Sequence, residues 1–176
     1  MLETRSKSQN YRRAVRSTVW LLIVAAAGAI LCSTLLLSVL RVQGTSMEPT
    51  LRQGEILLVI KRTSVHSGDV AAFYYNNKVL LKRVVAEAGD EVAVQEDGTV
   101  TVDGEALDEP YLAEKSLGSC DVTFPEQVPD GRVFVLGDNR KSSIDSRSSA
   151  IGCISQKSMI GKVILRIWPL GRIRVF

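Results

Sequence analysis

The sequence predicts a mainly β protein in which one N-terminal transmembrane helix precedes a domain of antiparallel sheets. Three observations lead to this class. An uncharged stretch of 23 residues runs from Thr18 to Leu40. The later residues form short β-branched runs separated by glycine and aspartate, as strands and turns do. Helical periodicity is scarce among them. The 176 residues fit one compact domain plus an accessory segment.

The first predicted element is a membrane-spanning helix over residues 18–40. At about 1.5 Å per residue it would be roughly 34 Å long, enough to cross a hydrocarbon core of about 30 Å. A removed signal peptide would have a shorter apolar run and a small-x-small site, whereas this run ends in Val39-Leu40-Arg41. A buried core helix is rarely apolar all round at this length, and a transit peptide would be amphipathic and Arg-rich. The pattern favours a span.

The charges predict the orientation of this helix. Residues 1–17 carry one acidic residue and five basic ones, Arg5, Lys7, Arg12, Arg13 and Arg16. By the positive-inside rule, 1–17 is a cytoplasmic tail able to touch anionic lipid, and 41–176 lies outside a plasma membrane crossed once. Beyond residue 17 there are 17 basic and 18 acidic residues, so a basic groove for nucleic acid is not supported.

Seven strands are predicted in the outer domain from alternation and β-branched content. They are Glu55–Ile60, Val70–Tyr75, Val79–Ala86, Glu91–Gln95, Thr99–Val102, Arg132–Leu136 and Lys162–Ile167. Glu96-Asp97-Gly98 predicts a tight hairpin loop, and 111–130 has no clear period. Cys120 and Cys153 could pair in an oxidising space, a question the sequence leaves open.

A candidate nucleophile, Ser46, lies in Gly44-Thr45-Ser46-Met47-Glu48-Pro49, a few residues past the predicted span. Small neighbours and a following proline suit a turn that presents a hydroxyl, although such serines are also ordinary turn or capping residues. A serine hydroxyl needs a nearby base to become a good nucleophile. If Ser46 is the nucleophile, the active site must lie at the membrane surface.

Two residue types could supply that base. His66 is the single histidine and lies in a polar loop, where a solvated role accounts for it as well as a Ser-His-Asp triad. Lys82 lies within the apolar strand Val79–Ala86, with Leu80 and Val84 on the same face. Burial would lower its pKa and let it accept a proton, whereas a snorkelling or edge-strand lysine would stay charged.

Two further segments accompany these. Residues 137–147, Gly-Asp-Asn-Arg-Lys-Ser-Ser-Ile-Asp-Ser-Arg, follow an apolar strand and are dense in groups that could hold a lysine or simply form a polar loop. Residues 68–73, Gly-Asp-Val-Ala-Ala-Phe, are a turn that enters a strand.

In this order after a single span, the four segments resemble the nucleophile, strand, lysine and final-loop boxes of the bacterial type I signal peptidases. The tail Gly161–Pro169 resembles their closing strand, so the likeness covers nearly all of the chain beyond the span. It implies a signal-peptidase-like domain and a serine endopeptidase that cleaves secretory preproteins after Ala-x-Ala-like sites, bound as an extended strand. No cofactor or metal is needed for this chemistry.

The resemblance also implies residue roles. Ser46 would be the nucleophile and Lys82 the general base, with Ser143 orienting the lysine. Asp145 and Arg147 would pair to hold the loop, and Asp138 would buttress it. Met47 would follow the nucleophile in the binding cleft, and the pockets for small residues would be lined in part by Val42, Leu51, Leu80 and Leu81.

Two departures define the subtype that the resemblance implies. Gly44 stands where some members have a serine that assists the oxyanion, which leaves the Ser46 N–H as one donor and the second open. Residues 89–130 form a reduced accessory insertion with a hairpin, as in compact Gram-positive-like enzymes. Eukaryotic-type relatives carry histidine at the position of Lys82.

Three other functions compete with this one. A tethered assembly factor could retain the fold, and a repressor-class Ser/Lys autoprotease shares the dyad but would need a DNA-binding domain. A structural β domain would have an ionised Lys82 and an inert Ser46. The sequence does not give the oligomeric state.

Overall fold

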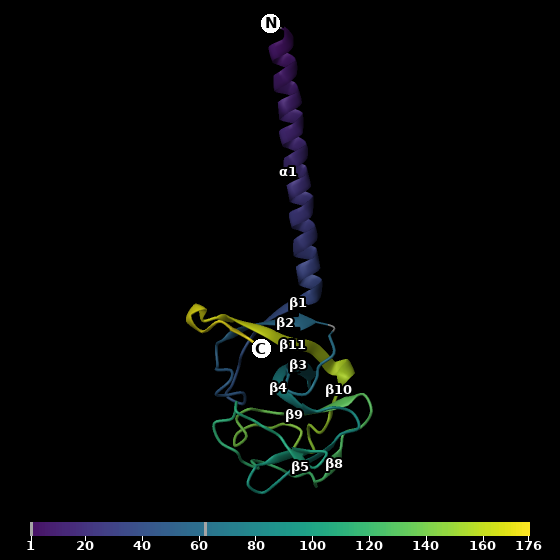
Figure 1. The fold of residues 1–176 in the computed structure, drawn as a ribbon, viewed down its shortest axis with the longest axis vertical. Helices are drawn as coiled ribbons and strands as arrows, with labels where there is room; N and C mark the ends of the chain where they lie inside the picture. The colour runs from purple at the N-terminus through teal and green to yellow at the C-terminus, as the bar shows by residue number, and fades with distance from the viewer. Residues whose placement is uncertain (1, 62) are drawn as a thin grey trace. The chain divides into compact units, whose positions relative to one another are not determined.

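The computed structural model describes residues 2–61 and 63–176, with side chains from Val15 onward. The chain divides into two compact units, and the boundary in the sequence lies between Leu37 and Ser38. The first is one long helix, α1 (Leu2–Leu36), and the second carries the sheets (Figure 1). The side chains of the basic residues Arg5, Lys7, Arg12 and Arg13 lie outside what is described.

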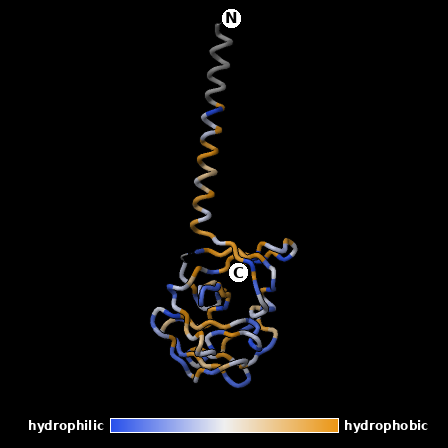
Figure 2. The backbone as a smooth tube through the Cα atoms, turned by 180° about the vertical axis from the view of Figure 1, so that it is seen from behind, coloured by the Kyte–Doolittle hydropathy of each residue, from blue (hydrophilic) through white to orange (hydrophobic). Residues whose placement is uncertain are grey.

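Within α1, Val15–Leu36 is long and apolar enough to cross a membrane, with 22 residues and a mean hydropathy of 2.4. None of this stretch is buried in protein, and it is mostly orange in Figure 2. A helix of this length spans roughly 33 Å, close to the thickness of a hydrocarbon core. Because its apolar side chains are exposed all round, the alternative of a buried core helix does not apply to it.

The predicted C-terminal limit of the span, Leu40, is wrong. The helix ends at Leu36, and Leu37–Arg41 form strand β1, which is hydrogen-bonded to strand β2 (Ile56–Lys61). A short apolar run suits a helix end and a buried strand equally well. Pairing with a segment some fifteen residues later decides the outcome, and local composition does not report it.

All seven predicted strands are present, with ends that shift by up to three residues. They are β2 (Ile56–Lys61), β3 (Val70–Tyr75), β4 (Lys78–Ala86), β5 (Glu91–Val94), β6 (Val100–Val102), β9 (Arg132–Leu136) and β11 (Met159–Trp168). The structure adds β1 and short elements that the sequence did not predict: β7 (Glu105–Ala106), β8 (Glu126–Gln127), β10 (Ile154–Ser155), β12 (Arg174–Val175) and the 3-10 turns η1 (Gln156–Ser158) and η2 (Leu170–Arg172).

The strands form two sheets. The larger has the order β1-β2-β11-β3-β4-β9-β10, with β12 also paired to β11, and the smaller has the order β7-β6-β5-β8. The pairs β2–β11, β11–β3, β3–β4, β4–β9, β9–β10 and β5–β6 are antiparallel. The predicted hairpin is confirmed because Val94 pairs with Val100 across its loop. Figure 1 shows β5 and β8 at the opposite end of the domain from β11.

Two apolar clusters position the parts that matter for function. Val42, Met47 and Leu51 pack with Leu57 and Val59 of β2, so the turn containing Ser46 is anchored from beneath. At the other end, a second cluster joins the small sheet to β4 and β9: Val85, Val92, Val94, Val100, Phe134 and Leu136. The accessory segment (residues 89–130) is therefore packed against the strands that lead into the predicted site.

Cys120 and Cys153 are both free thiols. Cys120 Sγ donates to the Val122 carbonyl at 3.6 Å, and Cys153 Sγ to Glu126 Oε1 at 3.5 Å. Burial, together with the neighbouring Glu126 carboxylate, raises the pKa of the Cys153 thiol to about 12. Such a thiol has little thiolate character and is a poor partner for disulfide exchange.

Candidate active site

Ser46 lies in a tight turn between β1 and β2. The turn is closed by two backbone bonds, from Glu48 N to the Thr45 carbonyl at 3.0 Å and from Leu51 N to the Met47 carbonyl at 2.8 Å. Met47 and Leu51 are buried on either side, whereas Ser46 stays partly exposed. A positive φ of 81° at Gly44 suits glycine and starts the turn. The serine is thus fixed at its backbone and open at its hydroxyl.

The loop that follows β9 docks directly onto this turn. The Asn139 N–H donates to the Ser46 carbonyl at 3.0 Å, and Asn139 Nδ2 donates to the Thr45 carbonyl at 3.3 Å. Gly137 lies between this contact and Ser143. A Cβ at position 137 would lie 2.6 Å from the Ser46 carbonyl oxygen and would overlap Ser143 Oγ. Only glycine leaves room for the two serines to approach each other here.

Lys82 reaches the same place from β4. Its side chain is only 3% exposed, and its Nζ lies 2.7 Å from Ser143 Oγ. Burial lowers the pKa of Lys82 from its usual value near 10.5 to about 8; Asp145 and Asp138 act in the opposite direction and Arg147 in the same one. An amine with this pKa is neutral in an appreciable fraction of molecules near physiological pH and can then accept a proton.

Asp145 and Arg147 form an ion pair that is closed to solvent. Arg147 Nε and Nη2 each lie 2.8 Å from one Asp145 oxygen, and the Gly137 N–H donates to Asp145 Oδ2 at 2.9 Å. Burial alone would raise the pKa of Asp145, but the Arg147 bonds and charge and the Gly137 N–H outweigh it and lower that pKa. Asp145 therefore stays ionised, and its carboxylate holds the loop through the Gly137 N–H.

Asp138 supports the site from behind by way of Arg83. Arg83 Nε donates to Asp138 Oδ1 at 2.9 Å, and Nη2 to Oδ2 at 2.6 Å. Such two-point pairing fixes the relative orientation of both side chains. Because Arg83 directly follows Lys82, this contact ties the lysine strand to the loop that carries Ser143.

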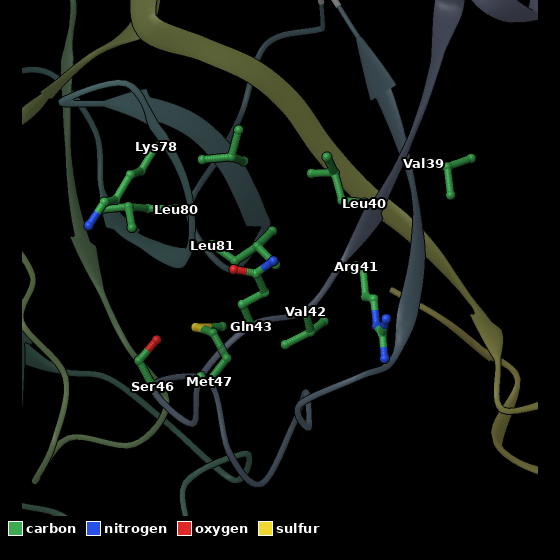
Figure 3. A pocket seen from close by; sticks show the side chains of 12 residues that line it. Val39, Leu40, Arg41, Val42, Gln43, Ser46, Met47, Lys78, Leu80 and Leu81 are labelled. Atoms are coloured by element: carbon green, nitrogen blue, oxygen red, sulfur yellow. The ribbon is translucent and has the colours of Figure 1, made fainter.

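A cavity of about 690 Å³ opens beside Ser46 (Figure 3). Ser46 and Met47 lie at one end and Val39 at the other (Figure 3). Its lining comes from residues 39–47 and from the start of β4, and it is mainly apolar: Val39, Leu40, Arg41, Val42, Gln43, Gly44, Ser46, Met47, Lys78, Val79, Leu80 and Leu81. Its walls are mostly extended segments, so its shape suits an extended peptide.

Most of the residues predicted to bind substrate line this cavity, namely Val42, Met47, Leu80 and Leu81. Leu51 does not, because it is fully buried beneath them. His66 lies away from this arrangement, in an exposed loop with its Nδ1 3.2 Å from Glu87 Oε2. Of the two candidate bases, Lys82 is the one that contacts Ser143, in the loop that docks onto the Ser46 turn.

Several residues around the site were not predicted from the sequence. Val39, Arg41, Gln43 and Lys78 line the cavity because β1 and the tip of β4 form its walls. Once residues 37–41 are recognised as a strand, alternation would have indicated part of this set. A second group consists of the buried residues Arg83, Glu109 and Arg140. Arg83 pairs with Asp138 and Glu109 pairs with Arg140, and such long sequence separations leave no local signal.

Comparisons with known proteins show the family of this chain. The family model described as signal peptidase, peptidase S26, matches residues 15–168. The chain is similar to signal peptidase I of Bacillus licheniformis, with 34% identity over 97% of this chain and 98% of that protein. It is also similar to signal peptidase IB of Staphylococcus aureus, with 33% identity over 88% and 91%.

A crystal structure of a signal peptidase I from Enterococcus faecalis V583 matches with 29% identity and a TM-score of 0.46, covering 57% of this chain and 97% of that one. The family match covers most of the chain and includes the Ser46 turn, the Lys82 strand and the 137–147 loop. The protein therefore belongs to the signal peptidase family, peptidase S26.

Proposed function

We propose that this type I signal peptidase cleaves preproteins with Ser46 as its nucleophile and Lys82 as its general base. The observation that carries the proposal is the buried Lys82 Nζ, 2.7 Å from Ser143 Oγ, in a loop that also bonds the Ser46 backbone. Burial lowers the pKa of this amine, which is what a lysine base requires. No other arrangement among the described residues combines a partly exposed serine, a desolvated base and an adjoining cavity.

The first step is acylation of Ser46. Neutral Lys82 takes the proton from the Ser46 hydroxyl as Oγ bonds to the scissile carbonyl carbon, and the carbonyl oxygen becomes an oxyanion. The Ser46 N–H is one donor for that oxyanion. Collapse breaks the peptide C–N bond, and the Lys82 ammonium returns its proton to the leaving amine. The products are the free mature protein and a signal-peptide ester of Ser46.

The second step is hydrolysis of that ester. Lys82, neutral again, takes a proton from a water that attacks the ester carbonyl, and the proton then passes to Ser46 Oγ as the ester bond breaks. Ser143 holds the lysine in place through both steps, and the Asp145–Arg147 pair holds Ser143's loop. The same base thus serves both half-reactions.

The cavity accounts for the class of substrate. The residues before the scissile bond would lie extended between residues 39–43 and Lys78–Leu81, with small side chains facing the apolar lining. Small residues before the cleavage point, as in an Ala-x-Ala site, fit beside Leu80 and Leu81 without displacing them. Bulkier residues would have to displace packed leucines.

We also infer the orientation in the membrane. The apolar helix fits an anchor of the plasma membrane. By the positive-inside rule, the basic residues before it favour a cytoplasmic N-terminus and a catalytic domain outside. The tail is then next to the headgroups of anionic lipid. Protease added to intact cells would degrade the catalytic domain if this is right and would spare it if the orientation is reversed.

The direct test is cleavage of a preprotein with an Ala-x-Ala site by the detergent-solubilised protein. The parent is expected to cut after that site, and Ser46→Ala and Lys82→Ala are each expected to abolish cutting while the domain stays folded. Retained cleavage by either variant would disprove the roles assigned here. Absence of cleavage by the folded parent would favour the assembly-factor function instead.

A further inference from the structure

The accessory segment reaches the candidate active site through three residues, Glu109-Pro110-Tyr111. The Glu109 carboxylate accepts hydrogen bonds from Arg140, whose Nη1 is 3.3 Å from Oε2 and whose Nη2 pairs with Oε1. The Tyr111 ring lies against Arg83, with 3.8 Å between Cζ and the ring centroid. Its hydroxyl donates to Glu109 Oε1 at 2.8 Å, so the two contacts form one connected unit.

Each of these arginines is a direct neighbour in sequence of a residue of the site: Arg83 follows Lys82, and Arg140 follows Asn139. Arg83 follows Lys82 on β4 and pairs with Asp138. Arg140 Nε donates to the Gly137 carbonyl at 3.2 Å, and the intervening Asn139 N–H holds the Ser46 carbonyl. The three-residue run therefore contacts the lysine strand on one side and the serine-holding loop on the other.

Burial makes these contacts strong constraints. Glu109 is 8% exposed and Arg140 is 1% exposed, so the removal of either charge leaves the other without compensation inside the protein. A second contact of the accessory segment acts on the same loop, because Arg147 Nη1 donates to the Leu117 carbonyl at 2.6 Å. The accessory segment thus bonds to two buried arginines of the 137–147 loop.

We propose that Glu109 and Tyr111 are positioning residues of the catalytic site: through Arg140 and Arg83 they hold the 137–147 loop against the Lys82 strand in the geometry for proton transfer. Neither lines the cavity assigned to substrate, so they act on the rate of the chemical step and leave substrate binding alone. This inference rests on the Ser46/Lys82 mechanism proposed above. It gives the reduced accessory segment a catalytic purpose.

The test compares Glu109→Gln with Asp108→Asn in the full-length, detergent-solubilised enzyme. Both remove one carboxylate charge from adjacent positions, but Asp108 is exposed and has no contact with the site described here. For Glu109→Gln, kcat per folded molecule is expected to fall about 10- to 100-fold, as for a misplacement of reacting groups by a fraction of an ångström to 1 Å, with KM within about twofold. Asp108→Asn is expected to keep both constants.

Tyr111 provides a second, independent pair of variants. Tyr111→Phe keeps the ring against Arg83 and loses only the hydroxyl bond to Glu109, so most of kcat should remain. Tyr111→Leu removes the ring and should lower kcat by about tenfold or more with KM unchanged. If Glu109→Gln does not fold, this pair still decides the proposal.

A double-mutant cycle tests the route through Arg140. The double variant Glu109→Gln/Arg140→Lys should lose much less kcat than the product of the two single fold-losses, because both substitutions act through one contact. Full multiplicativity, an unchanged kcat in Glu109→Gln, or a loss confined to KM would overturn the proposal. These outcomes require an active parent. A folded parent that does not cleave would refute the Ser46/Lys82 mechanism itself, which distinguishes that failure from a failure of the positioning proposal.

Discussion

Gly137 and Ser143 lie so close together that a Cβ on residue 137 would overlap the Ser143 hydroxyl oxygen. That hydroxyl is the partner of Lys82 Nζ, and the same Cβ would also lie 2.6 Å from the Ser46 carbonyl oxygen. A single missing methyl group therefore sets the spacing between the nucleophile turn and the group that orients the base.

Gly137→Ala is expected to lower kcat by about 100-fold or more, because the added methyl must displace Ser143, the Ser46 turn or both. Steady-state cleavage of an Ala-x-Ala preprotein measures this. Gly171→Ala is the matched control, since a Cβ there meets nothing within 4 Å, and it should cleave at the parent rate. Equal activities in the two variants would show that the loop can shift at no cost.

The pH dependence should follow the protonation of Lys82. Because the neutral amine is the active form and the pKa of Lys82 is about 8, kcat/KM should rise about tenfold per pH unit below pH 8 and level off above it. The Asp145 carboxylate raises that pKa and Arg147 lowers it, so Asp145→Asn should move the midpoint to lower pH.

The midpoint is read from the pH profile of the activity that Asp145→Asn retains. The exposed carboxylate of Asp130 provides the control, and Asp130→Asn should keep the parent midpoint near pH 8. A midpoint that stays in place in Asp145→Asn, or moves upward, would contradict the electrostatic account of the lysine.

Lys82→Met should stabilise the folded protein at neutral pH while abolishing cleavage. The folded pKa of Lys82, about 8, lies below the unfolded value near 10.5, so the unfolded chain binds more protons between these values. The shift destabilises the folded parent by about 3 kcal/mol at pH 7, and the variant is free of this cost. The variant also loses the hydrogen bond to Ser143, which destabilises it by about 1 kcal/mol. Lys82→Met should therefore be more stable than the parent by about 2 kcal/mol.

Thermal unfolding in detergent, followed across pH, measures this effect. The advantage of Lys82→Met should be full below pH 8 and should disappear as the pH rises from 8 to 10.5, where the parent lysine is neutral in both states. A variant less stable than the parent at pH 7 would show that Lys82 contributes more through packing and bonding than its burial costs.

Leu81 and Leu51 should respond differently to truncation although both pack in one apolar cluster. Leu81→Ala enlarges the substrate cavity and should allow cleavage after residues larger than alanine. Leu51→Ala leaves a void behind the cavity and should cost about 2–5 kcal/mol in unfolding free energy with unchanged specificity. Competition between preproteins with Ala, Val or Leu before the cut reports the first effect, and broadened specificity in Leu51→Ala would contradict the placement of Leu51.

The sequence predicted features that short-range patterns determine. Alternation located the seven main strands. For Lys82 the sequence left a buried base and a snorkelling or edge-strand lysine open, and the structure shows the buried one. The sequence could not indicate that Leu37–Arg41 would leave the helix for a sheet, because that depends on pairing with β2. Nor could it join Glu109 to Arg140 across 31 residues, since an ion pair of that separation has no spacing rule.

The three ion pairs around the site also determine how it responds to its surroundings. In Arg83–Asp138, Arg140–Glu109 and Arg147–Asp145, the exposure of each side chain is 11% or less, whereas His66 is 65% exposed in its pair with Glu87. Dissolved ions screen exposed pairs strongly and buried ones weakly. If the catalytic domain lies outside the cell, as proposed above, it meets an ionic strength that the cell does not control. The three buried pairs would then keep the geometry of the site when that salt concentration changes.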